Sequence, residues 1–344
     1  MWNIMQCAVQ GRSHVKDGIP CQDKTYSIFS NQVLAAALAD GAGSAKLSHF
    51  GAEEITKQLC AHLTQQFDHY YQEENGVAVK QKLMDSIRDC LRQTAKRLQC
   101  EPKDLSSTLL LAAVKGDRFI LIHIGDGVIG YLKNRQLKIA SHPENGEFAN
   151  TTVFTTSQQA INAMRLIKGR LEEIQGFVLL SDGAEASLYH KGTRQLAGAL
   201  KRVMELSFVI PAQRIQQLLE ESFQNVVRMA TMDDCSILIL TNDQGAFPGY
   251  AALPALERCR LLGIQPGSAA WEKRLRRFDA ILALTQVPQS LNCIARQLYM
   301  KPKYARKYLN QLCAQNLIQR QGSGYQALVS WTKPCPARLE PSGG

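Results

Sequence analysis

No apolar run in the 344-residue sequence approaches the roughly 18 residues that a membrane-spanning helix requires. Residues Met1 to Val9 also lack the basic flank and the long apolar stretch of a signal peptide. The ten cysteines are scattered, and no closely spaced pair resembles a zinc or redox motif. These absences predict a cytoplasmic protein with reduced, mostly buried thiols and no membrane partner.

Several catalytic signatures are missing as well. The sequence has no glycine-rich loop ending in Lys-Ser or Lys-Thr, no Gly-x-Ser-x-Gly elbow and no His-Glu-x-x-His segment. It has no repeats, and its one biased tract is the Pro/Gly-rich tail from Lys333 to Gly344. With 45% hydrophobic and 20% charged residues, the composition is that of a globular protein long enough for two domains.

The positive charge is concentrated in the last quarter of the chain. Residues 251–344 carry 14 Lys or Arg against 4 Asp or Glu, whereas residues 1–250 carry 26 of each. The net charge of +10 therefore belongs to the C-terminal segment. Such a field indicates a polyanionic partner for that segment, although clustered Lys and Arg also occur on ordinary solvated surfaces.

Short apolar runs alternate with amphipathic helical patterns over the first 240 or so residues. The runs predict buried strands at Val33–Leu38, Thr108–Val114, Phe119–Ile124, Phe177–Leu180 and Ile237–Leu240. Apolar residues every three or four positions predict helices after Lys46, around Leu83–Leu91 and around Ile215–Val226. Prolines and glycines interrupt the pattern near Ala246 to Ala270, which predicts the following division: domain 1–245, linker 246–268, second domain 269–332 and flexible tail 333–344.

Acidic residues mark the ends of these strands. An Asp-Gly step closes three of them, at Asp40, Asp126 and Asp182, and Asp233 precedes a fourth. One such step by itself is an ordinary turn signal, since Asp caps its own backbone and Gly accepts positive φ. Strands packed side by side would gather several acids at one rim, where like charges must be neutralised. The joint pattern therefore predicts a metal centre.

Divalent cations with oxygen ligands, Mg²⁺ or Mn²⁺, suit such a cluster. Two ions about 3.5–4 Å apart can activate a shared water and stabilise the charge on a transferred phosphoryl group. The chemistry expected is metal-assisted hydrolysis without a covalent intermediate.

The order of the motifs resembles the PPM, or protein phosphatase 2C, family of metal-dependent Ser/Thr phosphatases. The resemblance spans about residues 7 to 240 and rests on six segments: Gly18-Ile19-Pro20-Cys21-Gln22-Asp23, Ala39-Asp40-Gly41-Ala42-Gly43, Ser106-Ser107-Thr108-Leu109, Gly125-Asp126-Gly127, Ser181-Asp182-Gly183 and Asp233-Asp234-Cys235-Ser236. It implies an α+β fold, a four-layer α-β-β-α sandwich with the metal centre at one end. It also implies a phosphoprotein substrate and a cognate Ser/Thr kinase.

The resemblance assigns roles to individual positions. Asp40 would bridge two metals and Gly41 would offer its carbonyl, while Asp182 and Asp233 would hold one metal. Asp126 would be available to a third, weaker ion. Gln22 and Asp23 would support this shell, and the irregular stretch from about Asn134 to Gly169 would match the variable flap that sets substrate selectivity.

Two positions depart from the pattern of the family. Gln22 stands where many members have Glu, and an amide lacks the charge of a carboxylate, which predicts weaker binding of the second metal. Ala42 stands where members often have a His that serves as general acid. His14 and His49 are the nearest candidates to replace it, against the alternative of ordinary surface histidines. Two cations nearby are candidate phosphate contacts, Arg12 and Lys46.

The basic C-terminal segment predicts three helices and a hairpin. The helices are expected at Trp271 to about Thr285, from Ser290, which can cap the helix, and from Pro302 to Asn316; the hairpin turns at Gln321 to Gly324. This arrangement resembles a winged helix-turn-helix domain, with five candidate nucleic-acid contacts: Lys301, Lys303, Arg306, Lys307 and Arg320. A protein-docking or dimerisation role remains the alternative, because fold does not fix function.

The sequence therefore favours a Mn²⁺- or Mg²⁺-dependent phosphatase that acts on phosphoserine or phosphothreonine and is targeted or regulated by a winged-helix module. The rival readings are a catalytically weak phosphatase-like sensor and a DNA-binding regulator whose N-terminal domain senses a ligand.

Overall fold

The computed structural model describes residues 2–143, 152–242 and 249–331, which form two compact units. One unit comprises Trp2–Met204 and Leu218–Thr241, and the other comprises Glu205–Gln217 and the chain from Asn242 onward. Parts of several expectations fall outside the described residues, namely positions 144–151 of the expected flap, the first three residues of the linker and the tail 333–344.

The first unit contains two five-stranded sheets, and one of them runs in the order β2-β3-β4-β5-β8. Its strands are antiparallel neighbours with these bounds: β2 (Lys24–Ser30), β3 (Val33–Ala39), β4 (Leu109–Lys115), β5 (Arg118–Ile124) and β8 (Arg165–Arg170). Every residue of β3 is buried, because this strand has strands on both sides and apolar layers on both faces. The continuous apolar run therefore predicted the strand correctly.

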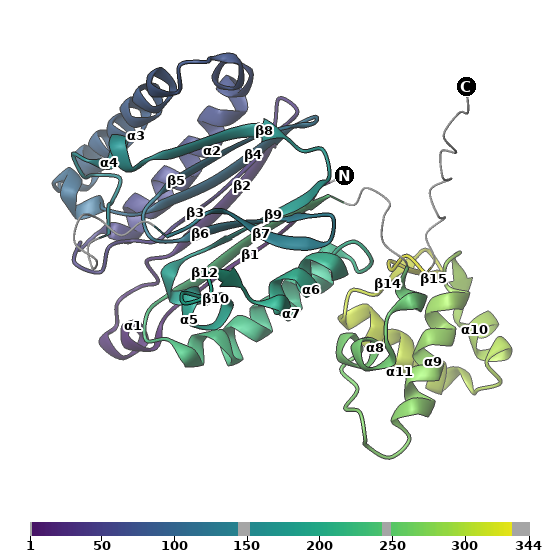
Figure 1. The fold of residues 1–344 in the computed structure, drawn as a ribbon. Helices are drawn as coiled ribbons and strands as arrows, with labels where there is room; N and C mark the ends of the chain where they lie inside the picture. Colours follow the sequence, from purple (N-terminus) through teal and green to yellow (C-terminus); the bar gives the residue numbers. More distant parts are fainter. Residues whose placement is uncertain (1, 144–151, 243–248, 332–344) are drawn as a thin grey trace, which may run out of the picture. The chain divides into compact units, whose positions relative to one another are not determined.

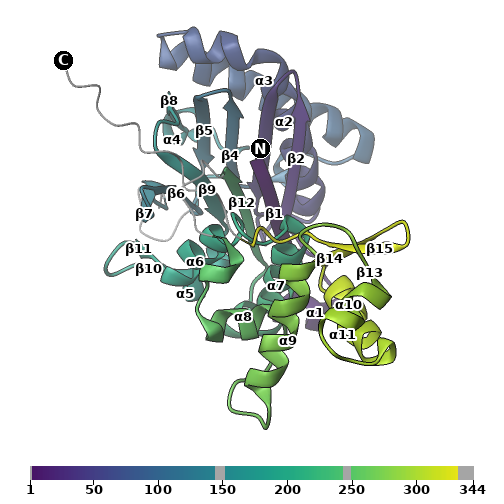
Figure 2. The ribbon, with the colours of Figure 1, turned by 90° about the vertical axis from the view of Figure 1, so that its right-hand side faces the viewer.

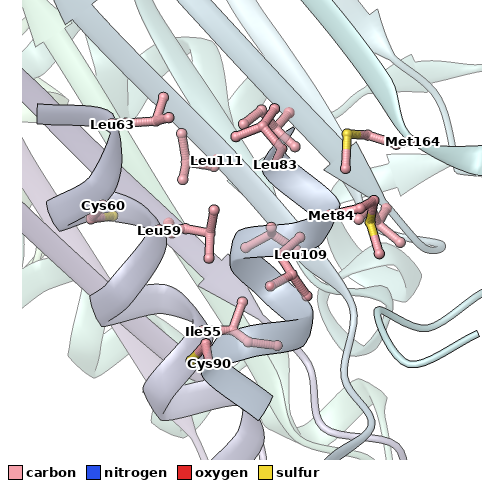
Figure 3. Close-up of a cluster of buried hydrophobic side chains, with 14 of the residues drawn as sticks. Ile55, Leu59, Cys60, Leu63, Leu83, Met84, Cys90, Leu109, Leu111 and Met164 are labelled. Carbon is pink, nitrogen blue, oxygen red and sulfur yellow. The ribbon is translucent and has the colours of Figure 1, made fainter. Parts of the chain in front are cut away.

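Two long helices cover the outer face of this sheet (Figures 1 and 2). They are α2 (Ser48–Gln72) and α3 (Gly76–Leu98), and the side chain of Asn75 caps α3 by accepting from the amides of Val77 and Ala78. Side chains one turn apart on α2 pack against alternate residues of the sheet (Figure 3), among them Ile55, Leu59, Leu63, Leu109 and Leu111. All five are fully buried, so the helical spacing predicted from the sequence marks this core.

The second sheet runs in the order β1-β12-β9-β6-β7. Its strands have these bounds: β1 (Trp2–Val9), β12 (Cys235–Asn242), β9 (Ile174–Leu180), β6 (Val128–Lys133) and β7 (Gln136–Ser141). The alternation of side chains along β3 sends Leu34, Ala36 and Leu38 into a core shared with residues of this second sheet, including Leu179 and Leu238. The two sheets therefore face each other across one apolar layer.

A second pair of helices follows in the chain, α6 (Gly198–Leu206) and α7 (Ala212–Asn225). Met204 of α6 lies over the second sheet, where a Cβ added at Gly176 of β9 would come 3.0 Å from its methyl carbon. The first unit is thus a mixed α+β fold in which two sheets pack together and helices lie on the outside, as expected.

Short elements connect these layers and shape one end of the unit. They are α1 (Arg12–Asp17), η1 (Pro102–Leu105), α4 (Ala160–Ala163), α5 (Asp182–Leu188), β10 (Tyr189–His190), β11 (Gln195–Leu196) and η2 (Val227–Ala230).

The described parts of the stretch from Asn134 to Gly169, which was expected to be irregular, contain more regular structure than predicted. Its beginning forms β7, which pairs with β6, and its end forms most of β8, which pairs with β5. Three of the six residues in each strand are polar or charged, and each strand lies at the edge of its sheet, where one side has no strand neighbour among the described residues. Periodicity alone did not identify these edge strands.

The second unit contains the three helices that the sequence predicted, together with a three-stranded sheet. The helices are α9 (Trp271–Leu284), α10 (Leu291–Gln297) and α11 (Pro302–Ala314), and the sheet has the order β13-β15-β14 with β13 (Gln289–Ser290), β14 (Ile318–Gln321) and β15 (Gly324–Ala327). Ser290 Oγ accepts from the Cys293 amide at 3.2 Å, which confirms the predicted cap. Pro302 occupies the first turn of α11, as predicted.

The segment expected to be a linker, 246–268, is folded over most of its described length. It contains η3 (Tyr250–Ala252) and α8 (Ala255–Leu261). Tyr250 is fully buried, and its hydroxyl donates to Asp279 at 3.1 Å, while Arg258 forms an ion pair with the same carboxylate at 2.6 Å. Prolines and glycines here mark turns between short helices, so the segment belongs to the second unit.

The described residues contain no helix that is long and apolar enough to cross a membrane. The nine cysteines in this part of the chain are free thiols, and Cys335 lies outside it.

Candidate metal centre

The end of the sandwich where β3, β5 and β9 finish gathers the predicted acids. Asp40 follows β3, and its amide donates to Thr108 Oγ1 at 2.9 Å. Asp182 opens α5 directly after β9. Ile237 pairs with Leu180 across β12 and β9, so the segment that precedes β12, including Asp233, lies beside the end of β9. Antiparallel pairing thus brings together residues far apart in the sequence.

Three carboxyl groups face one another at this end. The Asp40 carboxyl interacts with those of Asp23 and Asp182. Burial raises the pKa of Asp40 well above its usual range, and the negative charges of Asp23 and Asp182 raise it further. Burial likewise raises the pKa of Asp182. The acids are too close to ionise together unless a cation joins them.

Asp23 is the most deeply buried member, with 1% of its surface exposed. Burial raises its pKa to about 7, and the neighbouring Asp234 charge acts in the same direction, although Ser236, Ser181 and Asp40 oppose the shift. Asp23 is therefore a buried neighbour of Asp40.

Asp126 lies on the turn between β5 and β6 and reaches the same region. Its Oδ2 accepts a hydrogen bond from the Thr152 hydroxyl, and its charge contributes to the raised pKa of Asp182. His123, two residues before Gly125, is a structural residue: its ring nitrogens contact Ser141 Oγ at 2.7 Å and Gly125 O at 2.8 Å. Burial lowers the pKa of His123 to about 4, so it remains neutral and shapes the Asp126 turn.

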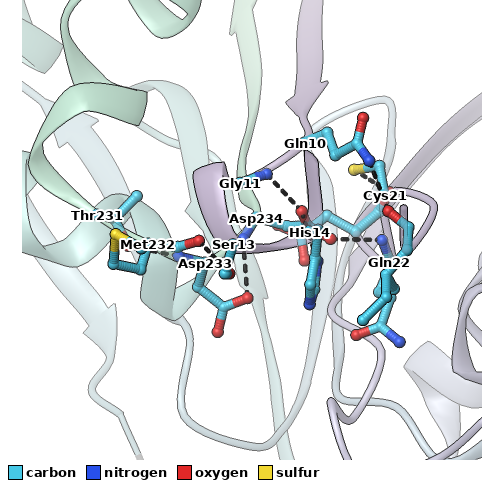
Figure 4. Close-up of polar contacts among 12 residues, drawn as sticks. Gln10, Gly11, Ser13, His14, Cys21, Gln22, Thr231, Met232, Asp233 and Asp234 are labelled. Carbon is cyan, nitrogen blue, oxygen red and sulfur yellow. Dashed lines mark hydrogen bonds and ion pairs between the residues drawn. The ribbon is translucent and has the colours of Figure 1, made fainter. Parts of the chain in front are cut away.

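A second carboxylate beside Asp233 organises the loops around the site (Figure 4). Asp234 is 1% exposed and accepts from the amides of Gly11 at 2.6 Å and Gln22 at 2.5 Å. His14 Nδ1 lies 2.9 Å from Asp234 Oδ1. The neighbouring Asp233 is exposed, and ligand atoms of His14, Asp233 and Asp234 lie within 4.8 Å of one another. The sequence motif contained Asp234, but its structural role was not predicted.

Two glycines are required by close packing. A Cβ at Gly183 would come 1.8 Å from the Asp234 carbonyl oxygen, and a Cβ at Gly41 would come 2.8 Å from Ser48 Cβ. Gly41 also forms an isolated antiparallel bridge with Ser107. The glycines of the Asp-Gly steps thus permit loops from different strands to approach, in addition to their role in turns.

Comparison with known proteins identifies the family of this chain. The family described as Protein phosphatase 2C matches residues 10–222, which include the whole stretch from Asp23 to Asp182. The chain belongs to the protein phosphatase 2C family. It is accordingly a metal-dependent phosphatase that acts on phosphoserine and phosphothreonine in proteins.

Individual relatives agree with this membership. Serine/threonine-protein phosphatase 3 of Escherichia coli (strain K12) is 25% identical over 183 residues, which cover 51% of this chain and 72% of the relative. The solved Serine/threonine phosphatase Stp1 from Staphylococcus aureus covers 71% of this chain and 96% of its own, with a TM-score of 0.50 and 16% identity. A bacterial serine phosphatase of known structure covers 71% and 98%, with a TM-score of 0.51 and 14% identity. The two solved structures show the fold.

The remaining predicted residues occupy different places in the phosphatase domain. Gln22 is buried beside Asp23, whereas Lys46 is exposed on the loop before α2. Arg12 Nε donates to Thr231 O at 3.0 Å, close to Asp233 in the chain. Of the two candidate histidines, His14 contacts Asp234, while the His49 ring packs on Phe50 with centroids 4.2 Å apart.

A cavity of about 580 Å³ opens beside the phosphatase acids Asp126 and Asp182. The other charged residues that line it are Arg165, Glu185, Lys191 and Arg194. None of these was predicted from the sequence as a site residue. Glu185 lies three residues after Asp182 on α5, the spacing that places two side chains on one helix face. The three-residue spacing between Asp182 and Glu185 could have indicated this shared helix face. The Asp182-Gly183 step, however, was interpreted from the sequence as a turn and not as the start of a helix.

The buried polar atoms fit a divalent cation. Four oxygens at this end of the sandwich are among the buried atoms of the described residues that lack a hydrogen-bond partner with good geometry: Gln22 Oε1, Asp23 Oδ1, Asp23 Oδ2 and Asp182 Oδ1. Buried polar groups are normally satisfied, so such a concentration requires a missing partner. All four are hard oxygen donors, which suit Mg²⁺ or Mn²⁺.

Proposed function

We propose that this phosphatase hydrolyses its substrates with two divalent cations held by Asp40, the Gly41 carbonyl, Asp182 and Asp233. The observation that carries the proposal is that the Asp40 carboxyl faces those of Asp23 and Asp182. Burial raises the pKa of all three groups, and the charges of Asp23 and Asp182 raise that of Asp40 further. Asp40 interacts with both Asp23 and Asp182, which suits it to bridge two ions. Mn²⁺ and Mg²⁺ are the proposed ions.

The neighbouring residues have supporting roles in this proposal. Asp126, which already accepts from the Thr152 hydroxyl, would hold a third and weaker ion. Asp23 and Gln22 lie behind the ligands and would fix their orientation or bind metal-coordinated water. Bound cations supply a water of low pKa as nucleophile and positive charge for the phosphoryl oxygens.

Arg12 and Lys46 are the proposed phosphate contacts. Arg12 is anchored by its Nε to the Thr231 carbonyl, next to the turn that carries Asp233. A guanidinium held there can bind phosphate oxygens with its remaining donors. Lys46 is exposed on the loop that follows Gly41 and can contribute a point charge.

Mn²⁺-stimulated hydrolysis of p-nitrophenyl phosphate and of a phosphothreonine peptide tests the proposed ligands. Asp40→Asn and Asp182→Asn should each reduce kcat/KM by at least about 100-fold, because each removes a charged oxygen from the centre. Asp117→Asn is the matched control, since Asp117 is exposed and pairs with Arg170. Equal rates in wild type and both site variants would contradict the assignment.

We propose that the second unit is a winged-helix domain that binds duplex DNA and thereby targets or regulates the phosphatase. Its topology supports this: three helices precede the hairpin β14–β15, whose strands pair from Ile318 with Ala327 to Gln321 with Gly324. The five predicted contacts are all exposed, on or beside α11 and on β14: Lys301, Lys303, Arg306, Lys307 and Arg320. Exposed cations along a helix and a hairpin are suited to phosphate contacts on a duplex.

We also propose that a Ser/Thr kinase acts on the same substrates, because a phosphatase of this specificity requires one. The alternative partner of the second unit is a protein. Measuring whether the full chain binds duplex DNA distinguishes this alternative from DNA binding.

A further inference from the structure

The charged cavity beside Asp126 and Asp182 contains more than the proposed metal ligands. Glu185 adds a third acid to its wall, and Arg165, Lys191 and Arg194 add three cations. The acids follow β5 and begin α5, whereas two of the cations belong to the hairpin that follows α5. The described wall of the cavity thus combines three acids with three cations.

The hairpin that carries Lys191 and Arg194 is fixed to the domain. Its strands β10 and β11 pair Tyr189 with Leu196, and the Ala197 amide donates to Leu188 O at 2.9 Å. A Cβ added at Gly130 of β6 would come 2.3 Å from Leu196 Cδ1, so this leucine packs directly on the second sheet. The turn from Lys191 to Arg194 is therefore held at the rim of the cavity.

The three cations of the cavity wall have different surroundings. Glu185 is 3% exposed and neutralises Lys191, whose Nζ lies 2.8 Å from Glu185 Oε2. Arg165 Nη1 donates to two uncharged oxygens, Ser141 Oγ at 3.2 Å and His142 O at 2.6 Å. Arg194 is exposed on the turn.

Metal ions at Asp126 and Asp182 would neutralise these two acids. Among the described lining residues, the cations Arg165, Lys191 and Arg194 would then outnumber the remaining acid, Glu185. A positive wall next to a phosphoryl-transfer site attracts anions and accelerates their association. Arginine is the side chain best suited to bind a carboxylate or phosphate, through two parallel hydrogen bonds.

We propose that Arg194, with Lys191 and Arg165, binds a second anionic group of the phosphopeptide substrate. The ligand is an acidic side chain or a second phosphate that flanks the phosphoserine or phosphothreonine. This makes the hairpin a specificity determinant that favours acidic or multiply phosphorylated segments. The inference rests on the proposed metal site, because the scissile phosphate must lie beside Asp126 and Asp182.

The test compares three phosphothreonine peptides of equal length, with alanine, glutamate or a second phosphothreonine in the flanking positions. Wild type should prefer the two anionic peptides. Arg194→Ala should reduce kcat/KM for these by about threefold and Arg194→Glu by about tenfold, through KM, since one exposed charge contact is lost or reversed. Rates on the alanine peptide and on p-nitrophenyl phosphate should change much less than rates on the two anionic peptides, and Arg194→Lys should retain part of the preference.

Arg135→Ala is the matched control. Arg135 lies on the exposed β6–β7 turn and has a φ of 61°, while Arg194 has a φ of 52°, so both substitutions put alanine in the same left-handed conformation. Arg135 is not among the residues that line the cavity. Its replacement should leave the preference for anionic peptides unchanged.

Binding of phosphonate analogues of the three peptides to the Mn²⁺-loaded full chain, measured by fluorescence anisotropy, separates this inference from the proposed function. Tighter binding of the anionic analogues that Arg194→Glu abolishes supports the inference even where turnover is slow. An anionic preference equal in wild type and Arg194→Glu overturns it. Wild-type protein that fails to hydrolyse p-nitrophenyl phosphate while retaining the Arg194-dependent binding contradicts the proposed function alone.

Discussion

Single buried carboxyl groups determine how this domain responds to pH. Burial raises the pKa of Asp23 to about 7, whereas an aspartate in an unfolded chain titrates near 3.9. Between these values the folded state binds more protons than the unfolded state, so the free energy of unfolding falls as pH rises. Burial shifts the pKa values of Asp40 and Asp182 in the same direction.

We therefore expect the free energy of unfolding of the metal-free protein to fall as pH rises from about 4 to 7. The full shift in the pKa of Asp23 corresponds to a loss on the order of 4 kcal/mol. Denaturant unfolding in EDTA at several pH values measures this. Asp23→Asn should flatten the pH dependence, and Asp117→Asn at an exposed position should not. A metal-free stability that is constant over this range would show that Asp23 ionises freely.

The side chain of Gln22 is a second single group whose replacement should have a measurable effect. Its Oε1 is buried near the acids and, among the described residues, has no well-formed hydrogen bond. Replacing it with glutamate adds the charge that many relatives have, so Gln22→Glu should lower the Mn²⁺ concentration for half-maximal activity by about tenfold. The measurement is a Mn²⁺ activation curve. An unchanged midpoint would place Gln22 outside the metal shell.

Among the elements, α5 connects the metal centre to the loop that precedes β12. Gly183 lies in its first turn, and a side chain there would collide with the Asp234 carbonyl. Because that oxygen belongs to the backbone, it cannot move without displacing β12. We expect Gly183→Ala to lower the thermal midpoint and to reduce activity by at least about tenfold, since small displacements of a catalytic group are costly.

Gly198→Ala is the control for this prediction, because Gly198 starts α6 and a Cβ there meets nothing within 4 Å. Thermal unfolding and hydrolysis of p-nitrophenyl phosphate measure both effects. If Gly183→Ala had wild-type stability and activity, α5 and the loop before β12 could move apart without loss of function, which would contradict this prediction.

Elements with a strong local signal were predicted from the sequence, and those that depend on distant partners were not. The apolar run Val33–Leu38 forms β3, and Ser290 caps α10 as expected. The edge strands β7 and β8 were missed, because their polar sequences become strands only through pairing with β6 and β5. Strand β13 has two residues and exists only through its pairing with β15.

The site shows the same division. The four Asp positions at strand ends could be found because each follows or precedes an apolar run. Asp234 could not, because its contacts with Gly11 and Gln22 join residues that are 223 and 212 positions apart. The Lys191–Arg194 turn could not, because its hairpin is held through the packing of Leu196 against Gly130 of the second sheet. Sequence patterns identify which residues end a strand, but loop packing decides which side chains surround the reacting group.

For the whole molecule, the uneven charge distribution predicts salt-dependent DNA binding by the full chain. Log Kd should depend linearly on log salt concentration, and each phosphate contact contributes about 0.9 to the slope. A variant with Lys303, Arg306 and Lys307 changed to alanine should bind more weakly and with a smaller slope. Gel retardation and fluorescence anisotropy on duplex DNA measure this, with Lys80→Ala and Lys82→Ala on α3 as controls. Absence of binding at low salt would favour a protein partner.

Calorimetric titration of Mn²⁺ into the metal-free full chain tests the central claim most directly, because it measures the ions themselves. We expect at least two ions to bind to wild type and to Asp117→Asn, with fewer or much weaker sites in Asp40→Asn and Asp182→Asn. The loss of binding should parallel the loss of Mn²⁺-stimulated hydrolysis of p-nitrophenyl phosphate. Unchanged Mn²⁺ binding in both site variants would contradict a metal centre built on Asp40 and Asp182.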